Sequence, residues 1–570
     1  MSSHRIETIA ILEACEYQEL DAFGKAHRGE DALPALAAFL RERFGCDLVL
    51  DHDIVSGFAK DSSHLPGAAE ALARPRNERQ VAIVLRACRS AGIRVTLSGG
   101  RSNLTGSATP EGGVVLSTVA LTEPAVQVFE ADRAVLAPVG IILEEMRKSV
   151  EVQTEGRLFF RVDPTSRTDA SVGGCLACNA SGFTPGDAGA MRHWVQALRV
   201  CLPDGRMVVA QRGQYLSQAG QFLLPGDAGD LVWPVPTYAR PAVKNAGGPF
   251  SAPDGVMDLV DLFVGSEGLF GLVTACTLGL APKPTAYLNL FFSLPSEDAA
   301  LCFYRAACAH FHGDLSVLTA FEYFGLHARQ YMTHDKRFFH KDDPVGIYIQ
   351  EPLYNREMDL AADDWLKILA DAGVNLADDQ TLVLVTDAQR ALFTEARHST
   401  AANYVEEVQH RGTFTVLTDC VVPPERFPAF LQFAHERISR EGIDYLAFGH
   451  LGDCHLHFAM LPMPAQTASA VVAYDDIVAR SADLGGVYSG EHGTGKRKRK
   501  DFLRCHGAEA VAQIRRCKTA VDPEWLLNVG AVCLFKEIPA ACSVRSNGLN
   551  NDGTGSPATD YVAGPTQEKE

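Results

Sequence analysis

The feature that most constrains this chain is a histidine-rich stretch, Tyr445–Met460, that is completed by the Gly-flanked Glu-His pair in Gly490–Gly495. In YLAFGHLGDCHLHFAM, apolar and polar residues alternate with a period of two on either side of the dipeptide at 452–453. That alternation predicts two short strands joined by a turn. His455 and His457 then share one face of the second strand, and the turn can bring His450 back beside His457.

Two imidazoles from this hairpin and the carboxylate of Glu491 suit zinc or a similar divalent ion, with one coordination position left open for substrate. The glycines around Glu491 let the backbone approach a ligand closely. His492 would then be free to move a proton. Clustered histidines are more often hydrogen-bonded structural residues than ligands, so these residues alone leave both interpretations open.

The composition and net charge of the chain are those of a globular protein. The chain has 570 residues, of which 46% are hydrophobic and 21% charged, as in an ordinary globular protein of two or three domains. The net charge of −18 argues against nucleic acid or an anionic membrane as the principal partner. No apolar run is long enough to span a membrane, and the segment 1–10 lacks the apolar core of a secretory signal.

The 15 cysteines are an odd number and form no CxxCxxC run, so we expect reduced thiols, a cytoplasmic location and no iron–sulfur cluster on this chain. Cys175 and Cys178 form a CxxC within the small-residue run GGCLACNASG. There, cysteine serves more simply as a compact apolar filler than as a redox group.

Along the chain, residues 1–45 read as a helical segment that Pro34 interrupts. Residues 46–284 alternate strand and helix, with a helix predicted over 78–91, a strand over 94–98 and a hairpin turning at 203–205. Residues 285–510 form a second region that includes the histidine hairpin. We expect 511–537 to pack back onto the earlier domain and 538–570 to be a disordered tail.

The strand at 94–98 runs into SGGRSNLTGSATP, a loop of small residues that offers several backbone N–H groups to a pyrophosphate. It is not GxGxxG, so the Rossmann fingerprint is absent. The segment 162–182 is also rich in small residues and lets a flat ligand lie against backbone. Either segment by itself would be an ordinary Gly/Ser-rich stretch.

Five motifs occur together in order: GGRSNLTGSATPEGGVVLS, DPTSRTDASVGGCLACNASG, LPDG, VGSEGLFGLVT, and GHLGDCHLH with GEHGTG. In this combination the chain resembles the FAD-linked dehydrogenases of the vanillyl-alcohol oxidase superfamily. The branch that it resembles contains D-lactate dehydrogenase, the glycolate oxidase flavoprotein subunit and D-2-hydroxyglutarate dehydrogenase. The resemblance implies an α+β fold: a PCMH-type FAD-binding domain of two α/β subdomains, and a cap domain with an antiparallel sheet flanked by helices.

The resemblance also implies roles for individual residues. The metal would be held by His450, His457 and Glu491, with zinc first and iron or manganese as alternatives. His492 would be the base, and Arg397 would bind the substrate carboxylate. The residues implied to bind FAD are Gly99, Gly100, Ser102, Asn103, Gly106 and Ser107 at the phosphates, and Pro164, Thr165, Gly173, Gly174, Asn179, Gly182, Val273 and Asn528 around the flavin.

The chain departs from this branch at several positions in the substrate, metal and FAD motifs. Leu417 stands where relatives carry a lysine, which puts the binding of a second carboxylate in doubt. His455 replaces the usual asparagine and Cys454 the usual glycine, so a fourth metal ligand or an altered pocket stays open. Arg101 replaces a small residue, and the C-terminal turn reads NVGA rather than NPGK.

Two other patterns have weaker interpretations. Residues 490–496 match GxxxxGK, but Arg497 replaces the Ser/Thr that would hold magnesium, and Glu491 would repel phosphate. The basic run KRKRK at 496–500 is interpreted first as a solvated face and second as a docking patch for an acidic electron-transfer partner.

The leading hypothesis is an FAD- and metal-dependent dehydrogenase of a D-2-hydroxy acid. Its electrons would pass to a separate acceptor, an iron–sulfur protein, cytochrome, quinone or electron-transferring flavoprotein. The enzyme would be cytoplasmic or peripheral to a membrane-associated electron-transfer complex, with a homodimer as the default. The alternatives are a flavoprotein subunit that only relays electrons and, ranked last, a transferase resembling alkylglycerone-phosphate synthase.

Overall fold

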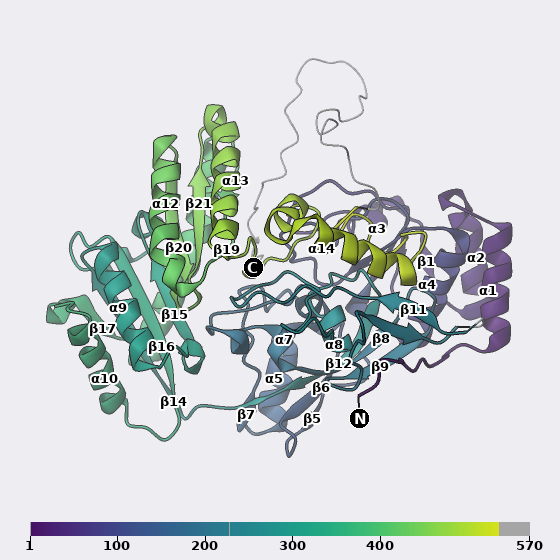
Figure 1. Cartoon of the computed structure of the whole chain (residues 1–570), viewed down its shortest axis with the longest axis horizontal. Coiled ribbons are helices and arrows are strands. Elements are labelled where there is room, and N and C mark those ends of the chain that lie inside the picture. The colour runs from purple at the N-terminus through teal and green to yellow at the C-terminus, as the bar shows by residue number, and fades with distance from the viewer. Residues whose placement is uncertain (1, 227–228, 535–570) are drawn as a thin grey trace.

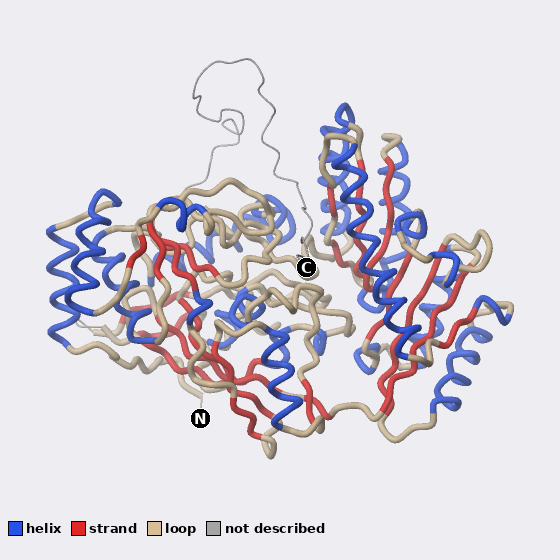
Figure 2. The backbone as a smooth tube through the Cα atoms, turned by 180° about the vertical axis from the view of Figure 1, so that it is seen from behind, coloured by secondary structure: helices blue, strands red, loops and turns tan. Residues whose placement is uncertain are grey.

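The computed structural model describes residues 2–226 and 229–534. Figure 1 shows two lobes: residues up to about 284 form the larger lobe, and the strands and helices from β14 to α13 form the smaller lobe. The view from behind in Figure 2 shows the chain passing between the lobes in a short connection at their base. The predicted tail at 538–570 lies outside the described residues.

The N-terminal segment contains two helices, α1 (Ala14–Ala26) and α2 (Leu33–Phe44), whose Phe23 and Phe39 rings stack at 4.3 Å. Pro34 lies in the first turn of α2, where its missing N–H interrupts no helical hydrogen bond. The expectation of helix in this segment is wrong for residues 2–13. They are extended because Ile6 is buried against the larger lobe and its N–H donates to the carbonyl of Leu223.

The first part of the larger lobe is a four-stranded sheet in the order β1-β2-β4-β3, with parallel β2/β4 and β4/β3 pairs. The predicted helix and strand are confirmed as α4 (Glu78–Ala91) and β3 (Val95–Ser98). The Asn77 side chain caps α4, and Gly92 ends it in the left-handed conformation at φ 67°. The other elements of this part are β1 (Leu48–Val49), α3 (His52–Ser56), β2 (Ala71–Ala73) and β4 (Val114–Ser117).

The second part of the larger lobe is a five-stranded antiparallel sheet in the order β5-β6-β12-β8-β9. Its predicted hairpin is confirmed: the Leu202 N–H donates to the Arg206 carbonyl across a turn that contains Gly205 at φ 84°. Its strands are β5 (Gln127–Phe129), β6 (Ala134–Pro138), β8 (Val195–Cys201), β9 (Met207–Gln211) and β12 (Leu272–Gly279). Around them lie α5 (Leu143–Gln153), β7 (Leu158–Phe159), α6 (Val172–Ala177), α7 (Met191–Trp194), β10 (Gln221–Leu224), β11 (Leu231–Pro234), α8 (Leu259–Phe263) and β13 (Ala281–Pro282).

The smaller lobe is built on an antiparallel sheet in the order β17-β14-β16-β15-β20-β21-β18, with β19 also paired to β21. Apolar residues of α9, α10, α12 and α13 pack in the core cluster on one face, and those of α11 pack on the other. The strands are β14 (Ala286–Leu294), β15 (Ala320–Phe324), β16 (Val345–Leu353), β17 (Thr381–Val383), β18 (Val416–Leu417), β19 (Cys420–Val421), β20 (Asp444–His450) and β21 (His455–Leu461). The helices are α9 (Glu297–His310), α10 (Met358–Asp371), α11 (Asp387–His410), α12 (Phe427–Arg440) and α13 (Thr467–Asp483).

The chain then returns to the larger lobe through α14 (Arg499–Val521), which Gly507 kinks at φ 81°. The Trp233 indole donates to the Cys517 carbonyl at 3.1 Å, and Leu527 pairs with Val95 at the start of β3. The mixture of helices and antiparallel sheets confirms the predicted α+β class. The domain boundaries at 45, 284, 510 and 537 stay predictions.

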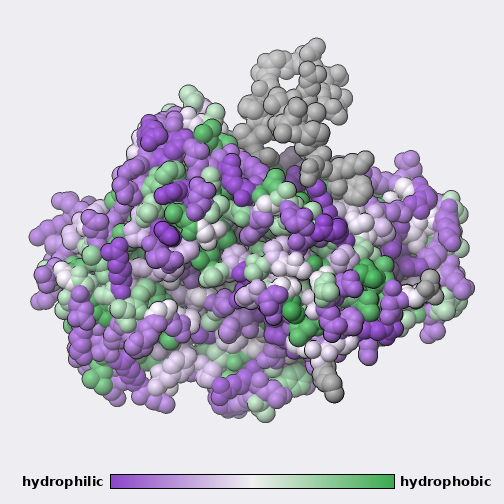
Figure 3. All heavy atoms as spheres, viewed as in Figure 1, coloured by the Kyte–Doolittle hydropathy of each residue, from purple (hydrophilic) through white to green (hydrophobic). Residues whose placement is uncertain are grey.

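The face in Figure 3 is mostly hydrophilic, with hydrophobic residues scattered in small groups. Every helix in the described part of the chain is too short or too polar to cross a lipid bilayer. The 14 cysteines of the described residues are all free thiols, including Cys175 and Cys178.

Candidate functional site

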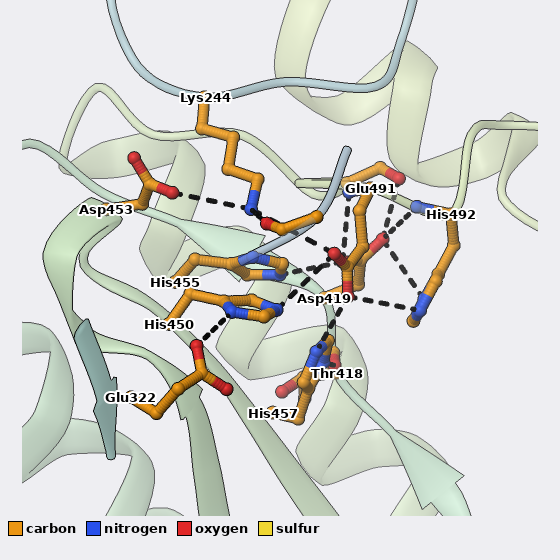
Figure 4. Close-up of polar contacts among 12 residues, drawn as sticks. Lys244, Glu322, Thr418, Asp419, His450, Asp453, His455, His457, Glu491 and His492 are labelled. Atoms are coloured by element: carbon orange, nitrogen blue, oxygen red, sulfur yellow. Dashed lines mark hydrogen bonds and ion pairs between the residues drawn. The ribbon is translucent and has the colours of Figure 1, made fainter. Parts of the chain in front are cut away.

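The hairpin of β20 and β21 brings three histidines together on one face of the cap sheet (Figure 4). His450 lies directly opposite His455, and Phe448 lies opposite His457. Ring centroids are 5.4 Å apart for His450 and His455, 4.7 Å for His455 and His457, and 6.1 Å for His450 and His457. All three rings are buried, so any charge that they carry must be balanced within the protein.

Glu491 faces two of these rings. Its Oε1 lies 3.1 Å from His457 Nε2, and its Oε2 lies 3.4 Å from His450 Nε2. The other ring nitrogens face acceptors: His450 Nδ1 is 2.6 Å from a carboxylate oxygen of Glu322, and His457 Nδ1 is 3.0 Å from the Thr418 carbonyl. Because those acceptors require N–H at Nδ1, a neutral ring turns its Nε2 lone pair toward Glu491.

This arrangement fits a divalent metal ion. When both rings are neutral, two imidazole lone pairs and a carboxylate converge, and the far ring nitrogens are held as outer hydrogen bonds hold metal-ligating histidines. Without the ion, a proton on a ring Nε2 would have to lie between the histidines and Glu491 to balance the carboxylate charge. Burial disfavours charge on His450, but the carboxylate of Glu322 outweighs it and, with Glu491, raises the pKa of His450 to about 9.

Asp419 lies on the same side of the site as His492 and binds several of its residues. The sequence motifs did not point to it. This fully buried carboxylate accepts hydrogen bonds from His455 Nε2 at 2.8 Å, Ser489 Oγ at 2.7 Å and Lys498 Nζ at 2.7 Å. It also accepts the backbone N–H of His492 at 3.1 Å. A ring nitrogen of His455 lies within 4.8 Å of ligand atoms of His450, His457 and Glu491. The Nε2 of His455, however, is hydrogen-bonded to Asp419.

His492 stacks on His457 with ring centroids 5.4 Å apart. Its Nδ1 lies 3.3 Å from Asp419 Oδ2, and its Nε2 lies 3.7 Å from Glu491 Oε1. Burial lowers the pKa of His492 to about 4, so the ring is neutral at physiological pH. A neutral ring whose proton sits on Nδ1, the nitrogen that faces Asp419, keeps Nε2 available to accept a proton.

Arg397 reaches the same corner from α11, but it is not a free cation. Its Nη2 and Nε lie 2.6 and 3.1 Å from Glu322 Oε2, and its guanidinium carbon lies 4.0 Å from the centre of the Phe183 ring. Burial alone would raise the pKa of Glu322, but the charges of His450 and Arg397 lower it to about 2. Glu322 is therefore an ionised partner that the motifs did not reveal.

Lys244 is a third residue that the sequence did not single out. Its side chain is only 1% exposed, and its Nζ lies 3.3 Å from Asp453 Oδ2 and 3.9 Å from Glu491 Oε2. It also donates to the Gly182 carbonyl at 3.3 Å. Lys244 thus carries a buried positive charge from the larger lobe to the histidine site (Figure 4).

The Gly-rich loop after β3 fits a pyrophosphate. Within the described residues, the backbone N–H groups of 100–104 donate to no protein acceptor, while Asn103 Oδ1 accepts the N–H groups of Thr105 and Ser107, both at 3.0 Å. Arg101 has φ 61° and Gly106 φ 84°, so the loop curls left-handed at two points. Consecutive unpaired amides on such a curl form an anion-binding concavity.

Several motifs that are distant in sequence meet at Glu267 of the GSEG turn. Its buried carboxylate accepts the N–H groups of Thr494 at 2.7 Å and Gly495 at 2.8 Å, and it also contacts the Ser107 hydroxyl. The Asn528 amide donates to the Glu267 carbonyl at 2.6 Å. The Gly-rich loop, the GSEG turn, the C-terminal segment and the Glu-His loop therefore contact one another at Glu267.

A small cavity beside this junction is lined by Asn179, Arg192, Lys244 and Asn245, among others. Two of these lining residues each have a buried side-chain atom without a hydrogen-bond partner in the described chain: Asn245 Oδ1, an acceptor, and Arg192 Nε, a donor. The edge of a flavin ring presents both N–H and carbonyl groups, so this donor and acceptor pair fits it. Together with the amide-rich loop, the cavity supports an FAD site.

The individual roles of the remaining predicted FAD residues stay predictions. Asn179 accepts the Arg192 N–H and donates to the Asn245 carbonyl, both at 2.9 Å. The others are Gly99, Ser102, Pro164, Thr165, Gly173, Gly174 and Val273.

The basic run at 496–500 is tied to the rest of the protein rather than displayed as a free patch. Each of its five side chains has an intramolecular partner. The contacts are Lys496 to Glu111 at 2.7 Å, Arg497 to the Ser63 carbonyl at 2.6 Å, Lys498 to Asp419 at 2.7 Å, Arg499 to the Gly530 carbonyl at 2.9 Å and Lys500 to Asp475 at 2.8 Å.

Known proteins match both halves of this site. Residues 69–211 match the model of an FAD binding domain, and residues 356–532 match that of the FAD linked oxidases, C-terminal domain. D-2-hydroxyglutarate dehydrogenase of Xanthomonas citri pv. viticola is 26% identical over 82% of this chain and 90% of its own length. D-lactate dehydrogenase of Archaeoglobus fulgidus is 25% identical over 82% and 92%.

Among solved structures, 4-ethylphenol oxidase from Gulosibacter chungangensis superposes with a TM-score of 0.64 at 16% identity, covering 90% of this chain and 98% of that one. An alkyldihydroxyacetonephosphate synthase superposes with a TM-score of 0.59 at 15% identity, covering 87% and 84%. At these identities the superpositions establish a common fold.

Proposed function

This chain belongs to the FAD-linked oxidase family, and from that premise we propose that it oxidises a D-2-hydroxy acid of the D-lactate kind to the 2-oxo acid with the help of a divalent metal ion. The observation that carries the proposal is the convergence of His450 Nε2, His457 Nε2 and both oxygens of Glu491. The names of the dehydrogenase relatives, which act on D-lactate and D-2-hydroxyglutarate, support the substrate class.

The reaction removes a hydroxyl proton and a hydride from the α-carbon of the substrate. Bound FAD would supply the hydride acceptor, and a divalent ion held by His450, His457 and Glu491 would lower the pKa of the substrate hydroxyl and fix its position. His492 takes the hydroxyl proton at Nε2, while Asp419 holds its Nδ1 side. Zinc suits this nitrogen and oxygen donor set best, with iron and manganese as alternatives.

Two cations near the site suit an anionic substrate. Arg397 offers the part of its guanidinium that Glu322 does not occupy, and its planar fork suits a carboxylate. Lys244 adds positive charge on the opposite side, where Glu491 and Asp453 hold it. The electrons then leave for a separate acceptor, which we propose to be an iron–sulfur protein, cytochrome, quinone or electron-transferring flavoprotein.

The His492→Asn variant tests the proposed base. General-base catalysis contributes about 10²–10⁴-fold to rate, so flavin reduction by D-lactate or another D-2-hydroxy acid should slow by that factor while FAD and metal content stay at wild-type levels. His435→Asn is the matched control, because His435 is another half-buried cap histidine, hydrogen-bonded to Tyr445 and Glu297 away from the site. An unchanged reduction rate in His492→Asn would contradict the assignment.

A further inference from the structure

Glu322 is the point where the predicted metal site and the predicted carboxylate-binding arginine meet. One oxygen of this buried carboxylate lies 2.6 Å from His450 Nδ1, and the other lies 2.6 Å from Arg397 Nη2 and 3.1 Å from Arg397 Nε. The residue is 2% exposed. Because Glu322 is buried, solvent screens these contacts little, and each is stronger than the same contact at the surface.

The backbone fixes this arrangement. Glu322 on β15 stands directly opposite His450 on β20 in the antiparallel register, so both side chains leave the same face of the cap sheet. Arg397 comes from α11 on that face. Phe183, from the larger lobe, covers the pair: its ring centre is 4.0 Å from the Arg397 guanidinium carbon and 5.8 Å from the His450 ring.

The two contacts have different chemical effects. On His450, an acceptor at Nδ1 fixes the ring orientation and makes Nε2 a stronger metal ligand. On Arg397, the carboxylate occupies the Nε and Nη2 edge, whereas Nη1 makes no hydrogen bond to the described residues. The same carboxylate therefore aims a metal ligand and leaves a defined part of the guanidinium for an anion.

We propose that Glu322 is a positioning residue that couples metal binding at His450 to substrate-carboxylate binding at Arg397. The inference rests on the proposed function, because it requires both a metal ion and an anionic substrate. The inference predicts different effects for changes at Glu322 and at Arg397. Loss of the Glu322 charge frees both His450 and Arg397 to move, and metal affinity falls. Loss of Arg397 leaves the Glu322 carboxylate bonded to His450 alone, and metal affinity does not fall.

The test measures metal affinity in FAD-loaded protein by titration with Co²⁺, followed by visible absorbance and by competition with a chelator. Outer partners of metal-ligating histidines are worth about 10–100-fold in metal affinity, so Glu322→Gln should weaken Co²⁺ binding by that factor and alter the cobalt spectrum. Arg397→Gln should bind Co²⁺ at least as tightly as wild type. Glu351→Gln is the matched control, because Glu351 on the adjacent strand β16 also pairs with an arginine, Arg356, and with the Trp365 indole.

Glu322→Asp provides a second variant that keeps the charge but shortens the side chain. It cannot reach both partners as Glu322 does, so its Co²⁺ affinity should fall between those of wild type and Glu322→Gln. Wild-type affinity in both Glu322 variants would overturn the inference, and so would equal weakening in Arg397→Gln and Glu322→Gln. Wild-type protein that binds no Co²⁺ would instead refute the proposed metal site itself, and the coupling with it.

Discussion

Substituting Gly100 by alanine tests the assigned FAD phosphate loop. A Cβ at Gly100 would overlap the carbonyl oxygen of Asp169 and lie 3.1 Å from its carbonyl carbon and 3.2 Å from the Ser171 nitrogen. All three are backbone atoms, so no side chain can rotate away, and one of the two FAD segments must move. Overpacking of this kind costs about 1–3 kcal/mol, which corresponds to roughly 5–150-fold in affinity if the displaced amides bind the pyrophosphate.

The assay is titration of the FAD-free protein with FAD, followed by flavin fluorescence. Gly57→Ala is the matched control. Gly57 has helical dihedrals, φ −63° and ψ −14°, and its Cβ would meet only the Ile54 carbonyl, at 3.3 Å, although Gly57 itself contacts Arg101 of the loop. We expect the control to bind FAD as wild type does. Wild-type FAD affinity in a folded Gly100→Ala protein would refute the assignment of this loop.

Three further predictions concern the metal, the substrate and pH. His457→Ala should lower the metal affinity by more than the roughly 100-fold that loss of an outer partner costs, as measured by metal content after dialysis. Wild-type content would exclude His457 as a ligand. Leu417 lines a cavity with His492, so Leu417→Lys should raise kcat/KM for D-2-hydroxyglutarate relative to D-lactate by about tenfold, the worth of one charged hydrogen bond. An unchanged ratio would place the second carboxylate elsewhere. Burial raises the pKa of Asp501 to about 6, so the folded state holds a proton that the unfolded state has lost between about pH 4 and pH 6, and Asp501 costs stability as pH rises through that window. The Tm of Asp501→Asn relative to wild type should therefore be higher at pH 7 than at pH 4.5, and a constant difference would contradict the shift.

Local signals allowed parts of the fold to be predicted from the sequence. The helix ended by Gly92 and the strand after it agree with their predicted bounds within a residue, because an apolar helical pattern and a glycine that ends it are both local signals. The hairpins at Gly205 and at 452–453 were found for the same reason. The extended segment at 2–13 was missed, because its conformation is set by pairing with strands about 200 residues later.

The same distinction separates the site residues that could be predicted from those that could not. His450, His457 and Glu491 lie in short motifs with recognisable chemistry. Glu322 lies 128 residues before His450, and nothing in its strand AFEYF distinguishes it from a solvated glutamate. Lys244 likewise comes from a segment of the larger lobe, PAVKNAGG, that carries no recognisable motif. Only the folded chain shows that these charges face the histidines.

The central claim is tested most directly by adding a panel of D- and L-2-hydroxy acids to the FAD-loaded protein under anaerobic conditions, before and after chelation. We expect the absorbance of the oxidised flavin to bleach with at least one D-acid, to stay unchanged with its L-enantiomer, and to bleach no longer once the metal is removed. Restoring the divalent ion should restore the bleaching. A flavin that stays oxidised with every acid in metal-replete protein would contradict the proposed dehydrogenase. Bleaching that is unaffected by chelation would contradict the metal's part in it.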